Sequence, residues 1–401
     1  MSGPLKSDYL IIGAGVLGLA IARELKTRFP TKSIIVIEKE DHVAEHASGR
    51  NSGVLHAGFY YSADSLKAKF CRDGNAAWKA YAKQHGLRLN ECGKVVVAKD
   101  ETEQQMLYEL KRRGDLNGVV LELVDDTQLA ELEPNAKTHK EALFSPNTAV
   151  VDPREMCAHM ATELAAAGVS ILTSHAYEAR EGEGAVLAGG KRFEAGTIIN
   201  CAGVYADKIA HEFGFAEHYT IIPFKGIYLL WKGEGQPVKR CVYGVPNLAN
   251  PFLGVHFGVR VDGQTRIGPT SIPAFWRENY SGMEHFNLQE MLAISGWELK
   301  LFLTNAFNFR SLAFREMRKY IRSHMAGLAG QMVQHLDMGQ FSEWDRPGIR
   351  AQLLNTETSE LVMDFKVEGD GRSVHVLNAV SPAFTCALPF AAWVVDEYIQ
   401  K

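Results

Sequence analysis

The sequence has few of the features that mark secreted, metal-binding or membrane-spanning proteins. Its six cysteines are scattered and include no Cys-x-x-Cys pair, which argues against a disulfide framework or a cysteine-ligated metal and is typical of a reducing compartment. No apolar run approaches the roughly 20 residues that span a bilayer. Residues 1–8 are polar and resemble neither a secretory nor a transit leader. We therefore predict a cytoplasmic protein without a metal site.

Charge and composition exclude further classes of protein. The formal net charge is −4, so the overall balance does not favour a nucleic-acid partner. We find no internal repeat and no low-complexity tract. The chain has 401 residues, of which 46% are hydrophobic and 22% charged, enough for two domains or one large composite domain with a substantial core.

The first forty residues show a β–α–β pattern with a glycine-rich turn. The apolar run 9–12 leads into Gly13-Ala14-Gly15-Val16-Leu17-Gly18, and a helical pattern follows to residue 25. A second apolar run, 33–37, ends on Glu38. The pattern predicts two buried strands joined by a helix, which is the context that a dinucleotide-binding fingerprint requires.

Each residue of the fingerprint has a physical task. Gly13 permits the tight turn, Gly15 lets the backbone approach a pyrophosphate, and Gly18 lets the helix pack closely on the sheet. The helix N-terminus offers unpaired N–H groups to phosphates, and Glu38 can accept hydrogen bonds from ribose hydroxyls. We predict a bound dinucleotide; the alternative is a structural turn without a ligand.

Three further features favour FAD over NAD. The fingerprint stands near the start of the sequence, and no second one follows for a separate nicotinamide. The segment 46–58 is rich in small and hydrogen-bonding residues that can follow an extended cofactor closely. The strand-like run 374–377, the turn 378–384 and the helical stretch 387–398 can place a positive helix end near a flavin. Alternatively, this last unit only closes the sheet.

Taken together, these segments resemble the D-amino-acid-oxidase-like superfamily of FAD oxidoreductases and, within it, the L-2-hydroxyglutarate dehydrogenase/oxidase family. The resemblance runs nearly from end to end of the chain. The motifs that carry it are 51–58 with 60–61, 65–69, 92–94, 251–256, 268–269, 348–352, 364–365 and 378–383. The resemblance implies FAD as cofactor and a small carboxylate as substrate.

The resemblance also implies an α/β fold with two domains. One is a Rossmann-like FAD-binding domain, and the other is an α+β substrate domain on a mixed, largely antiparallel sheet. We assign 1–90, 150–215 and 346–401 to the discontinuous FAD-binding domain, and 91–149 and 216–345 to the substrate domain. Local patterns agree, with strands expected at 95–98, 221–231, 252–261 and 265–267 and helices at 101–114, 153–168 and 287–303. Asn287 followed by Glu290 predicts the start of the last helix.

The residues expected to hold FAD combine the fingerprint with positions implied by the resemblance. They are Gly13, Gly15, Gly18, Glu38, Lys39, Ser48, Asn51, Ser52, Gly53, Ala202, Gly203, Ser381, Pro382 and Ala383.

Oxidation of a 2-hydroxy acid moves a hydride to flavin N5 while the hydroxyl loses a proton, so the site needs a base and a dry flavin face. Histidine is the natural base near neutral pH. His56 lies beside the flavin by resemblance, and His256 is a second candidate on a substrate-domain strand. For either residue, the alternative is a hydrogen-bonded structural histidine.

The substrate carboxylates need cations. Arg350 is the first candidate, because a guanidinium binds a carboxylate in a bidentate way, although a surface salt bridge is the alternative for any arginine. A dicarboxylate needs a second cation, for which Lys225 and Arg277 are candidates. Further residues that could donate hydrogen bonds are Tyr228, Ser381 and Thr385.

Departures from the family pattern leave the substrate open. Arg50 stands where the family usually has His, Lys225 and Ile227 where it has Arg and Glu, and Phe384 where it has Ala. L-2-hydroxyglutarate oxidised to 2-oxoglutarate is the leading hypothesis. An amino acid, a secondary amine or glycerol 3-phosphate is the alternative, and a non-enzymatic dinucleotide sensor is a more distant one. The electron acceptor, quinone or oxygen, is not decided.

The stretch 309–336 combines several basic residues with an approximate helical stripe of apolar ones. A basic amphipathic helix can rest on an anionic membrane, where a quinone could reoxidise the flavin, so one hypothesis is peripheral contact at the inner face of a membrane. The simpler interpretation, which the sequence alone favours, is a solvated helix face that covers the substrate domain.

Overall fold

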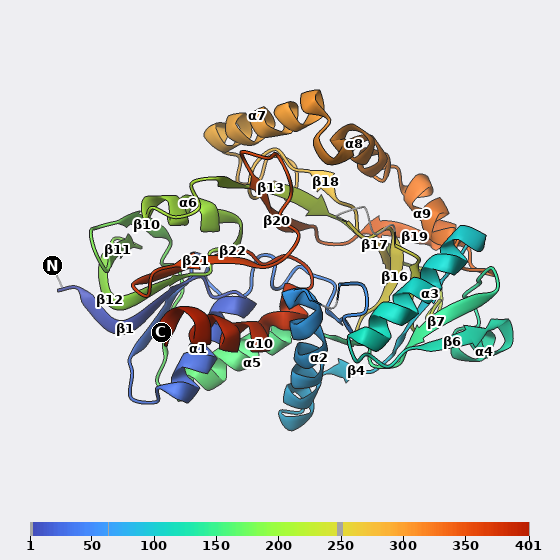
Figure 1. Cartoon of the computed structure of the whole chain (residues 1–401), viewed down its shortest axis with the longest axis horizontal. Coiled ribbons are helices and arrows are strands. Elements are labelled where there is room, and N and C mark those ends of the chain that lie inside the picture. The colour runs from blue at the N-terminus through green and yellow to red at the C-terminus, as the bar shows by residue number, and fades with distance from the viewer. Residues whose placement is uncertain (1–2, 63, 247–251, 401) are drawn as a thin grey trace. The chain divides into compact units, whose positions relative to one another are not determined.

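The computed structural model describes residues 3–62, 64–246 and 252–400, and Pro251 of the predicted 251–256 motif lies outside them. The chain forms two compact units (Figure 1). The first unit comprises Met1–Asn51, Pro153–Pro223 and Ala351–Lys401, and the second comprises Ser52–Asp152 and Phe224–Arg350. Residues 52–90, which the sequence placed with the FAD-binding domain, therefore belong to the second unit.

The first unit is built on an eight-stranded sheet. Strands β10-β11-β12-β1-β2-β9 follow one another, and β22 pairs with β12 and with β21. The pairs among β1, β2, β9, β12 and β22 are parallel, whereas β10, β11 and β21 join antiparallel. The strands are β1 (Leu5–Ile12), β2 (Ile34–Ile37), β9 (Ser170–Leu172), β10 (Tyr177–Arg180), β11 (Ala185–Ala188), β12 (Lys191–Asn200), β21 (Lys366–Gly369) and β22 (Ser373–Asn378).

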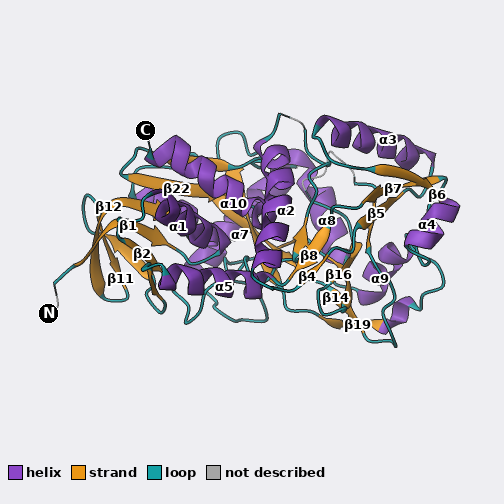
Figure 2. Cartoon of the chain, turned by 90° about the horizontal axis from the view of Figure 1, so that it is seen from below, coloured by secondary structure: helices purple, strands orange, loops and turns teal. Residues whose placement is uncertain are grey.

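Helices cover both faces of this sheet. In Figure 1, α6 (Ala206–Glu212) lies above the sheet, and α1 (Val16–Arg28), α5 (Pro153–Ala166) and α10 (Ala383–Val394) lie below it. Figure 2 shows the last three side by side, and α1 contacts both of its neighbours. Short helical turns at Gly203–Tyr205 and Val395–Ile399 complete the unit. The predicted α/β fold class is confirmed.

The parallel strands are buried because both faces are covered. All four residues of β2 and the last four of β1 are buried, as expected for strands with helices on both sides. Helix α1 buries Leu19, Ile21 and Leu25, which point to more than one side of the helix. The β–α–β unit of residues 5–37 thus forms as the apolar periodicity indicates.

The second unit is built on a different sheet. Its eight strands follow the order β19-β14-β17-β16-β15-β5-β7-β6, and only the β15–β5 pair is parallel, so the mixed, largely antiparallel sheet is as predicted. The strands are β5 (Lys94–Val97), β6 (Glu122–Asp125), β7 (Glu141–Ser145), β14 (Leu229–Trp231), β15 (Cys241–Gly244), β16 (His256–Val259), β17 (Thr265–Gly268) and β19 (Phe341–Trp344).

Alternate residues of β5 pack in two separate hydrophobic clusters, because successive side chains of a strand point to opposite faces. Val95 and Val97 pack in a cluster with Met325 and Ala329 of α9 (Arg322–Gly330). Val96 packs on the other face, in a cluster with Leu107 and Leu110 of α3 (Glu101–Leu116), Phe59, Tyr60 and Tyr243.

The remaining elements of the second unit are a small three-stranded sheet and several helices. Strand β8 (Ala149–Val151) pairs with β3 (Val54–Leu55) and with β4 (Leu89–Asn90), and this pairing holds residues 52–90 in the second unit. The helices are α2 (Leu66–Gln84), α4 (Asp126–Leu132), α7 (Leu288–Thr304) and α8 (Phe309–Arg318), with short turns at Ala306–Asn308 and Met338–Gln340. The predicted cap is confirmed: the Asn287 side chain accepts a hydrogen bond from the Glu290 N–H.

Two predicted elements differ from the structure. The single strand expected at 221–231 is divided into β13 (Tyr219–Gly226) and β14, because Ile227 instead bonds to the Thr270 hydroxyl. Strand β13 lies between β18 (Ile272–Pro273) and β20 (Gly348–Asn355). The single amphipathic stripe expected over 309–336 is wrong. It is broken between α8 and α9, and α9 buries its apolar residues in the core.

Candidate active site

The glycine-rich turn of the first unit leaves no room for side chains. Gly13 has φ +104°, and a Cβ there would lie 2.6 Å from the Cys201 carbonyl oxygen. A Cβ at Gly18 would lie 2.0 Å from the Gly13 carbonyl oxygen. The first contact keeps the turn close to the end of β12, and the second brings α1 against the turn, as the fingerprint requires.

Polar side chains surround the start of α1. The buried Glu38 carboxylate follows β2 and accepts a hydrogen bond from the Ala14 N–H at 2.8 Å. The Ser48 hydroxyl accepts one from the Val16 N–H at 2.9 Å, and a Cβ at Gly15 would lie 2.9 Å from the same oxygen. Backbone N–H groups and an acidic side chain thus converge at one helix end, which suits the pyrophosphate and ribose of a dinucleotide.

Other predicted cofactor residues of the first unit lie at strand and helix ends. Lys39 directly follows Glu38 and pairs with Glu40 at 2.8 Å, and the Asn51 amide donates to the Ser48 carbonyl at 2.6 Å. Ala202 and Gly203 follow β12, and among the described residues other than its chain neighbours no atom lies within 4 Å of a Cβ built on the exposed Gly203. This open space at the carboxyl end of a parallel strand is where ligands of such sheets bind.

The start of α10 contributes a second helix end. Pro382 is its N-cap residue and makes no side-chain cap hydrogen bond, and Ala383 is its first residue, whose N–H donates to the Val380 carbonyl oxygen. Ser381 is exposed, whereas Thr385 is buried within the first turn. The positive end of the helix dipole suits an electron-rich group of a ligand.

One face of the large sheet of the second unit carries a row of polar and aromatic side chains. The registers pair Cys241 with Lys94, Val242 with Phe257, and Gly258 with Arg266. Because paired residues share a face and alternate residues return to it, Lys94, Tyr243, His256 and Arg266 all lie on the same face. Residues far apart in the sequence therefore meet on four adjacent strands.

His256 is held as a neutral base. Its Nδ1 lies 2.9 Å from the Gly254 carbonyl oxygen, and since a carbonyl only accepts, Nδ1 carries the proton and Nε2 keeps its lone pair. The ring stacks on Tyr243, with centroids 3.7 Å apart. Burial, opposed by the hydrogen bond to Gly254, lowers the pKa of His256 to about 3.

His56, the other predicted base, is also buried in the second unit. Burial, followed by the positive charges of Lys94 and His256, lowers its pKa well below the usual range. Its carbonyl oxygen accepts hydrogen bonds from the Cys71 thiol and the Asn75 amide. The two predicted histidines therefore share one electrostatic environment.

Two cations lie at the neighbouring strands β13 and β20. A Cβ at Gly226 would lie 3.9 Å from the Gly348 carbonyl oxygen, so the two strands approach each other there. Lys225 is one residue from this point on its strand, and Arg350 is two residues from it on the other. The Lys225 ammonium has no hydrogen-bond or ion-pair partner in the described ranges. Arg350 lies over the Phe252 ring, 4.9 Å from its centroid. Burial lowers the pKa of Arg350 to about 10 and also lowers that of Lys225.

The other predicted substrate residues have internal partners. Arg277 is buried beside Glu290, with Nε 3.9 Å from its carboxylate, so Lys225 is the better second cation. Tyr228 lies under the Arg266 guanidinium, 4.3 Å from the ring centroid, and Arg266 in turn pairs with Asp345 at 2.9 Å. Ser52 accepts a hydrogen bond from Arg266 through its carbonyl oxygen, and the neighbouring Gly53 carbonyl accepts one from Val151.

Comparison with known proteins agrees with this geometry. Residues 8–396 match the FAD dependent oxidoreductase family. The chain is 34% identical to L-2-hydroxyglutarate dehydrogenase of Escherichia coli (strain K12) over 97% of this chain and 92% of that protein. It is 35% identical to the mitochondrial L-2-hydroxyglutarate dehydrogenase of Homo sapiens over 98% and 89%. The chain belongs to the L-2-hydroxyglutarate dehydrogenase family of FAD-dependent oxidoreductases.

Solved structures show the same fold. The FAD-bound L-alpha-glycerophosphate oxidase of Mycoplasma pneumoniae superposes with a TM-score of 0.76 at 22% identity, covering 97% of this chain and 94% of that one. Glycine oxidase of Geobacillus kaustophilus gives a TM-score of 0.71 at 17% identity, covering 98% and 94%. As a member of this family the protein is an FAD-dependent enzyme, and the glycine turn, Glu38 and the two helix ends of its first unit fit that cofactor.

The structure brings together residues that the sequence did not single out for the site. Lys94 closes the Cys92-Gly93-Lys94 motif, and Tyr243 and Arg266 lie in unremarkable strand-like runs. Only the sheet register brings these three side chains beside His256. A charged residue at an otherwise apolar strand position, as in Lys94-Val95-Val96-Val97, is the one signal that could have revealed Lys94.

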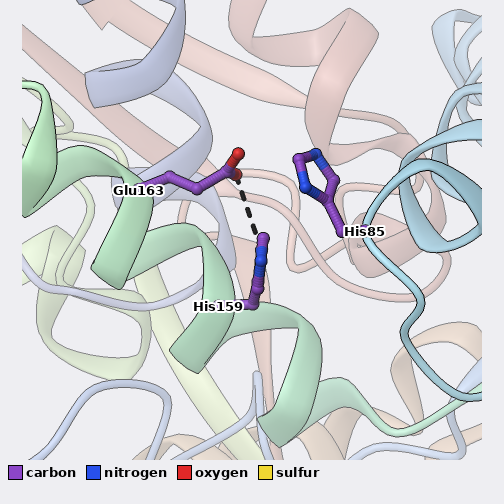
Figure 3. A group of neighbouring side chains, drawn as sticks. All are labelled: His85, His159 and Glu163. Carbon is purple, nitrogen blue, oxygen red and sulfur yellow. Dashed lines mark ion pairs between the residues drawn. The ribbon is translucent and has the colours of Figure 1, made fainter.

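Two groups of side chains combine histidines with carboxylates, the residue types that bind metals. His159 and Glu163 lie one turn apart on α5 and form an ion pair of 3.6 Å, drawn with His85 in Figure 3. His46 and Glu40 pair at 2.8 Å. The third residue of each group, His85 or Glu278, belongs to the other compact unit, so we assign no metal site to either group.

Proposed function

We propose that this enzyme oxidises L-2-hydroxyglutarate to 2-oxoglutarate. The observation that carries the proposal is the pair of cations, Arg350 and Lys225, on two neighbouring strands of the unit that also holds His256. A dicarboxylate needs two positive charges, and a buried guanidinium can hold one carboxylate by two parallel hydrogen bonds. The relatives at 34–35% identity are L-2-hydroxyglutarate dehydrogenases.

His256 serves as the base in this proposal. Its Nε2 lone pair accepts the hydroxyl proton of the substrate, while the Gly254 carbonyl holds the ring in the required tautomer. His56 is the alternative base that could accept the same proton. When bound, FAD supplies the hydride acceptor. Arg350 and Lys225 orient the substrate, and the aromatic residues beside them, Phe252 and Phe224, exclude water.

The first test is an anaerobic absorbance spectrum of the purified holoenzyme before and after substrate. Bleaching of the flavin band by L-2-hydroxyglutarate is expected. Bleaching instead by an amino acid, a secondary amine or glycerol 3-phosphate would establish the alternative substrate classes. An oxidised flavin with every compound would reject this substrate assignment.

Two variants locate the substrate carboxylates. For Arg350→Met we expect kcat/KM for L-2-hydroxyglutarate to fall by about 100-fold or more, because a charge-assisted contact is lost in a buried place. Lys225→Met should remove most of the preference for the dicarboxylate over L-lactate. Lys232→Met, which removes an exposed lysine of the same unit, is the matched control. Equal loss with both substrates in Lys225→Met would contradict the role of Lys225.

We further propose that α7 and α8 rest on an anionic membrane, where a quinone takes the electrons. Helix α7 contacts α8, and the ring centroids of Phe302 on α7 and Phe314 on α8 lie 6.0 Å apart. Large apolar side chains are exposed on and beside both helices, namely Met283, Phe286, Leu288, Leu292, Leu299, Leu303, Phe314, Met317, Tyr320 and Ile321. Exposed basic residues accompany them, namely Lys300, Arg310, Arg315, Arg318 and Arg322. Apolar and basic groups together favour an interface with anionic lipid.

This surface replaces the predicted segment 309–336, since α9 is buried in the core. None of the helices in the described part of the chain has the length and apolar character to cross a bilayer. The test is sedimentation with phosphatidylglycerol vesicles at low and high salt. Leu292→Glu with Leu299→Glu should abolish binding, whereas Leu116→Glu, at a comparably exposed leucine of α3, should not. Oxygen consumption that matches turnover without a quinone would favour oxygen as the acceptor.

A further inference from the structure

Lys94 is a buried lysine whose ammonium has no hydrogen-bond partner among the described residues. It begins β5 and points to the same face as Val96, into the cluster that contains Phe59 and Tyr60. Its side chain is 0% exposed, and no group in the described ranges accepts a hydrogen bond from its ammonium. A buried cation without a hydrogen bond is costly, so its retention needs a physical reason.

Aromatic rings form a cage around the Lys94 ammonium. Its nitrogen lies 4.7 Å from the ring centroids of Phe59 and of Tyr60 and 4.6 Å from that of Tyr243. The faces of such rings attract a cation, whereas burial opposes the charge. Burial lowers the pKa of Lys94 to about 8, so the side chain is positively charged at neutral pH and loses that charge in mildly alkaline solution.

One wall of the cage connects Lys94 to the predicted base. The Tyr243 ring that contacts the ammonium also stacks on His256, with centroids 3.7 Å apart. The Lys94 charge disfavours protonation of His256, and it does the same to His56, where it is the largest influence after burial. A single buried charge therefore acts on both histidines.

We propose that Lys94 is a positioning residue: caged by Phe59, Tyr60 and Tyr243, its ammonium provides a fixed positive charge that adds to the effect of burial and favours the neutral, proton-accepting form of His256 and His56. The substrate does not need to reach the ammonium for this role. Its effect ends when Lys94 loses its proton.

Other titratable groups face the same centre. Around Lys94 these are the thiols of Cys71 on α2, Cys92 before β5 and Cys241 on β15, all of which favour its charge. Cys241 accepts a hydrogen bond from Cys92, which lowers the pKa of Cys241 to about 7. His256 is influenced additionally by Arg266 of β17 and by Lys319, which follows α8. A test must therefore separate Lys94 from Cys241.

The histidine rings of the holoenzyme can report the Lys94 charge directly. We would record the Cε1 resonances of ¹³C-labelled histidine between pH 6 and 9.5, assigning His56 and His256 with His→Gln variants. In the wild type these signals should show an inflection near the pKa of Lys94. The inflection should be absent in Lys94→Met and should remain in Cys241→Ser. This readout needs no substrate, so it is independent of the proposed L-2-hydroxyglutarate oxidation on which the catalytic meaning of the histidines rests.

A second measurement follows the consequence for turnover. If the proposed substrate is oxidised, the acid limb of kcat/KM should move upward by about 0.5 to 1.5 pH units in Lys94→Met, because a nearby like charge has been removed. Thermal stability and flavin content should be unchanged or higher, since methionine fills the space without an unpaired charge.

Three results would overturn the proposal. The first is a wild-type histidine signal without an inflection in this range, and the second is an inflection that persists in Lys94→Met or disappears in Cys241→Ser. The third is a Lys94→Met protein that fails to fold, because Lys94 would then be needed for the structure rather than for the charge of the histidines.

Discussion

The two compact units carry different kinds of candidate site residues. In the first unit, the residues predicted to hold the cofactor are mainly glycines and short side chains near helix ends, and most lie in short stretches such as 13–18 and 381–383. In the second unit, the candidate base and its neighbours are buried charged and aromatic residues. Lys94, His256 and Arg266 lie on three strands of one sheet although more than 150 residues separate the first from the others.

The difference follows from what each unit must recognise. A pyrophosphate binds to backbone N–H groups, which a short turn and a helix end supply wherever side chains are absent. A carboxylate substrate and its reacting proton need charged groups removed from water, and these are stable only when a folded core surrounds them. Local sequence therefore suffices for the first task, while the second depends on sheet register.

The largest effect on the first unit is expected when a methyl group is added at Gly18. In Gly18→Ala, the new Cβ would lie 2.0 Å from the Gly13 carbonyl oxygen, and backbone cannot move away as a flexible side chain can. We expect loss of bound FAD and destabilisation by about 3 kcal/mol or more, measured by flavin absorbance and thermal unfolding. Gly296→Ala, in α7 with nothing within 4 Å, is the control and should stabilise slightly. A Gly18→Ala protein with full flavin content would refute the close approach.

Replacing His256 in the second unit should reduce turnover without disturbing the fold. For His256→Gln we expect kcat to fall by about 10² to 10⁴-fold, the usual contribution of a positioned base, with flavin content unchanged. Since the pKa of His256 is lowered to about 3, its protonation should not reduce kcat/KM between pH 5 and 7. Stopped-flow flavin reduction across that range checks both points. If His56→Gln causes the large loss and His256→Gln does not, the roles of the two histidines are exchanged.

A smaller effect, on stability alone, tests whether every buried ionisable residue of the second unit takes part in the reaction. Glu298 of α7 is buried, one carboxylate oxygen has no partner in the described ranges, and burial raises its pKa to about 8. A raised carboxyl pKa means that stability is fully present below about pH 4.5 and declines as pH rises towards 8. Glu298→Gln should therefore stabilise the protein by on the order of 3 kcal/mol at pH 8 and by little at pH 4.5.

Thermal unfolding at both pH values measures this difference, and turnover should be unchanged. An equal effect at the two pH values would show that Glu298 is not protonated by burial. Reduced turnover would mean that the carboxylate has a part in the reaction.

Local sequence determined much of the first unit. The periodicity of residues 9–37 and the glycine spacing predicted the β–α–β unit and its turn, because apolar alternation and steric exclusion act over a few residues. The Asn287 cap of α7 was predictable for the same reason. The assignment of 52–90 was not, since β3 and β4 are held by β8, about 60 to 100 residues away.

Tertiary structure alone decided the surroundings of the base. Nothing near Lys94 in the chain indicates that Phe59, Tyr60 and Tyr243 surround it, or that Tyr243 also stacks on His256. Likewise, the single apolar stripe expected over 309–336 is broken, because α9 buries its apolar residues in the core while α7 and α8 leave several large apolar side chains exposed. Sequence determines which groups are available, but the cost of burying a charge depends on every atom around it, and only the folded chain sets those neighbours.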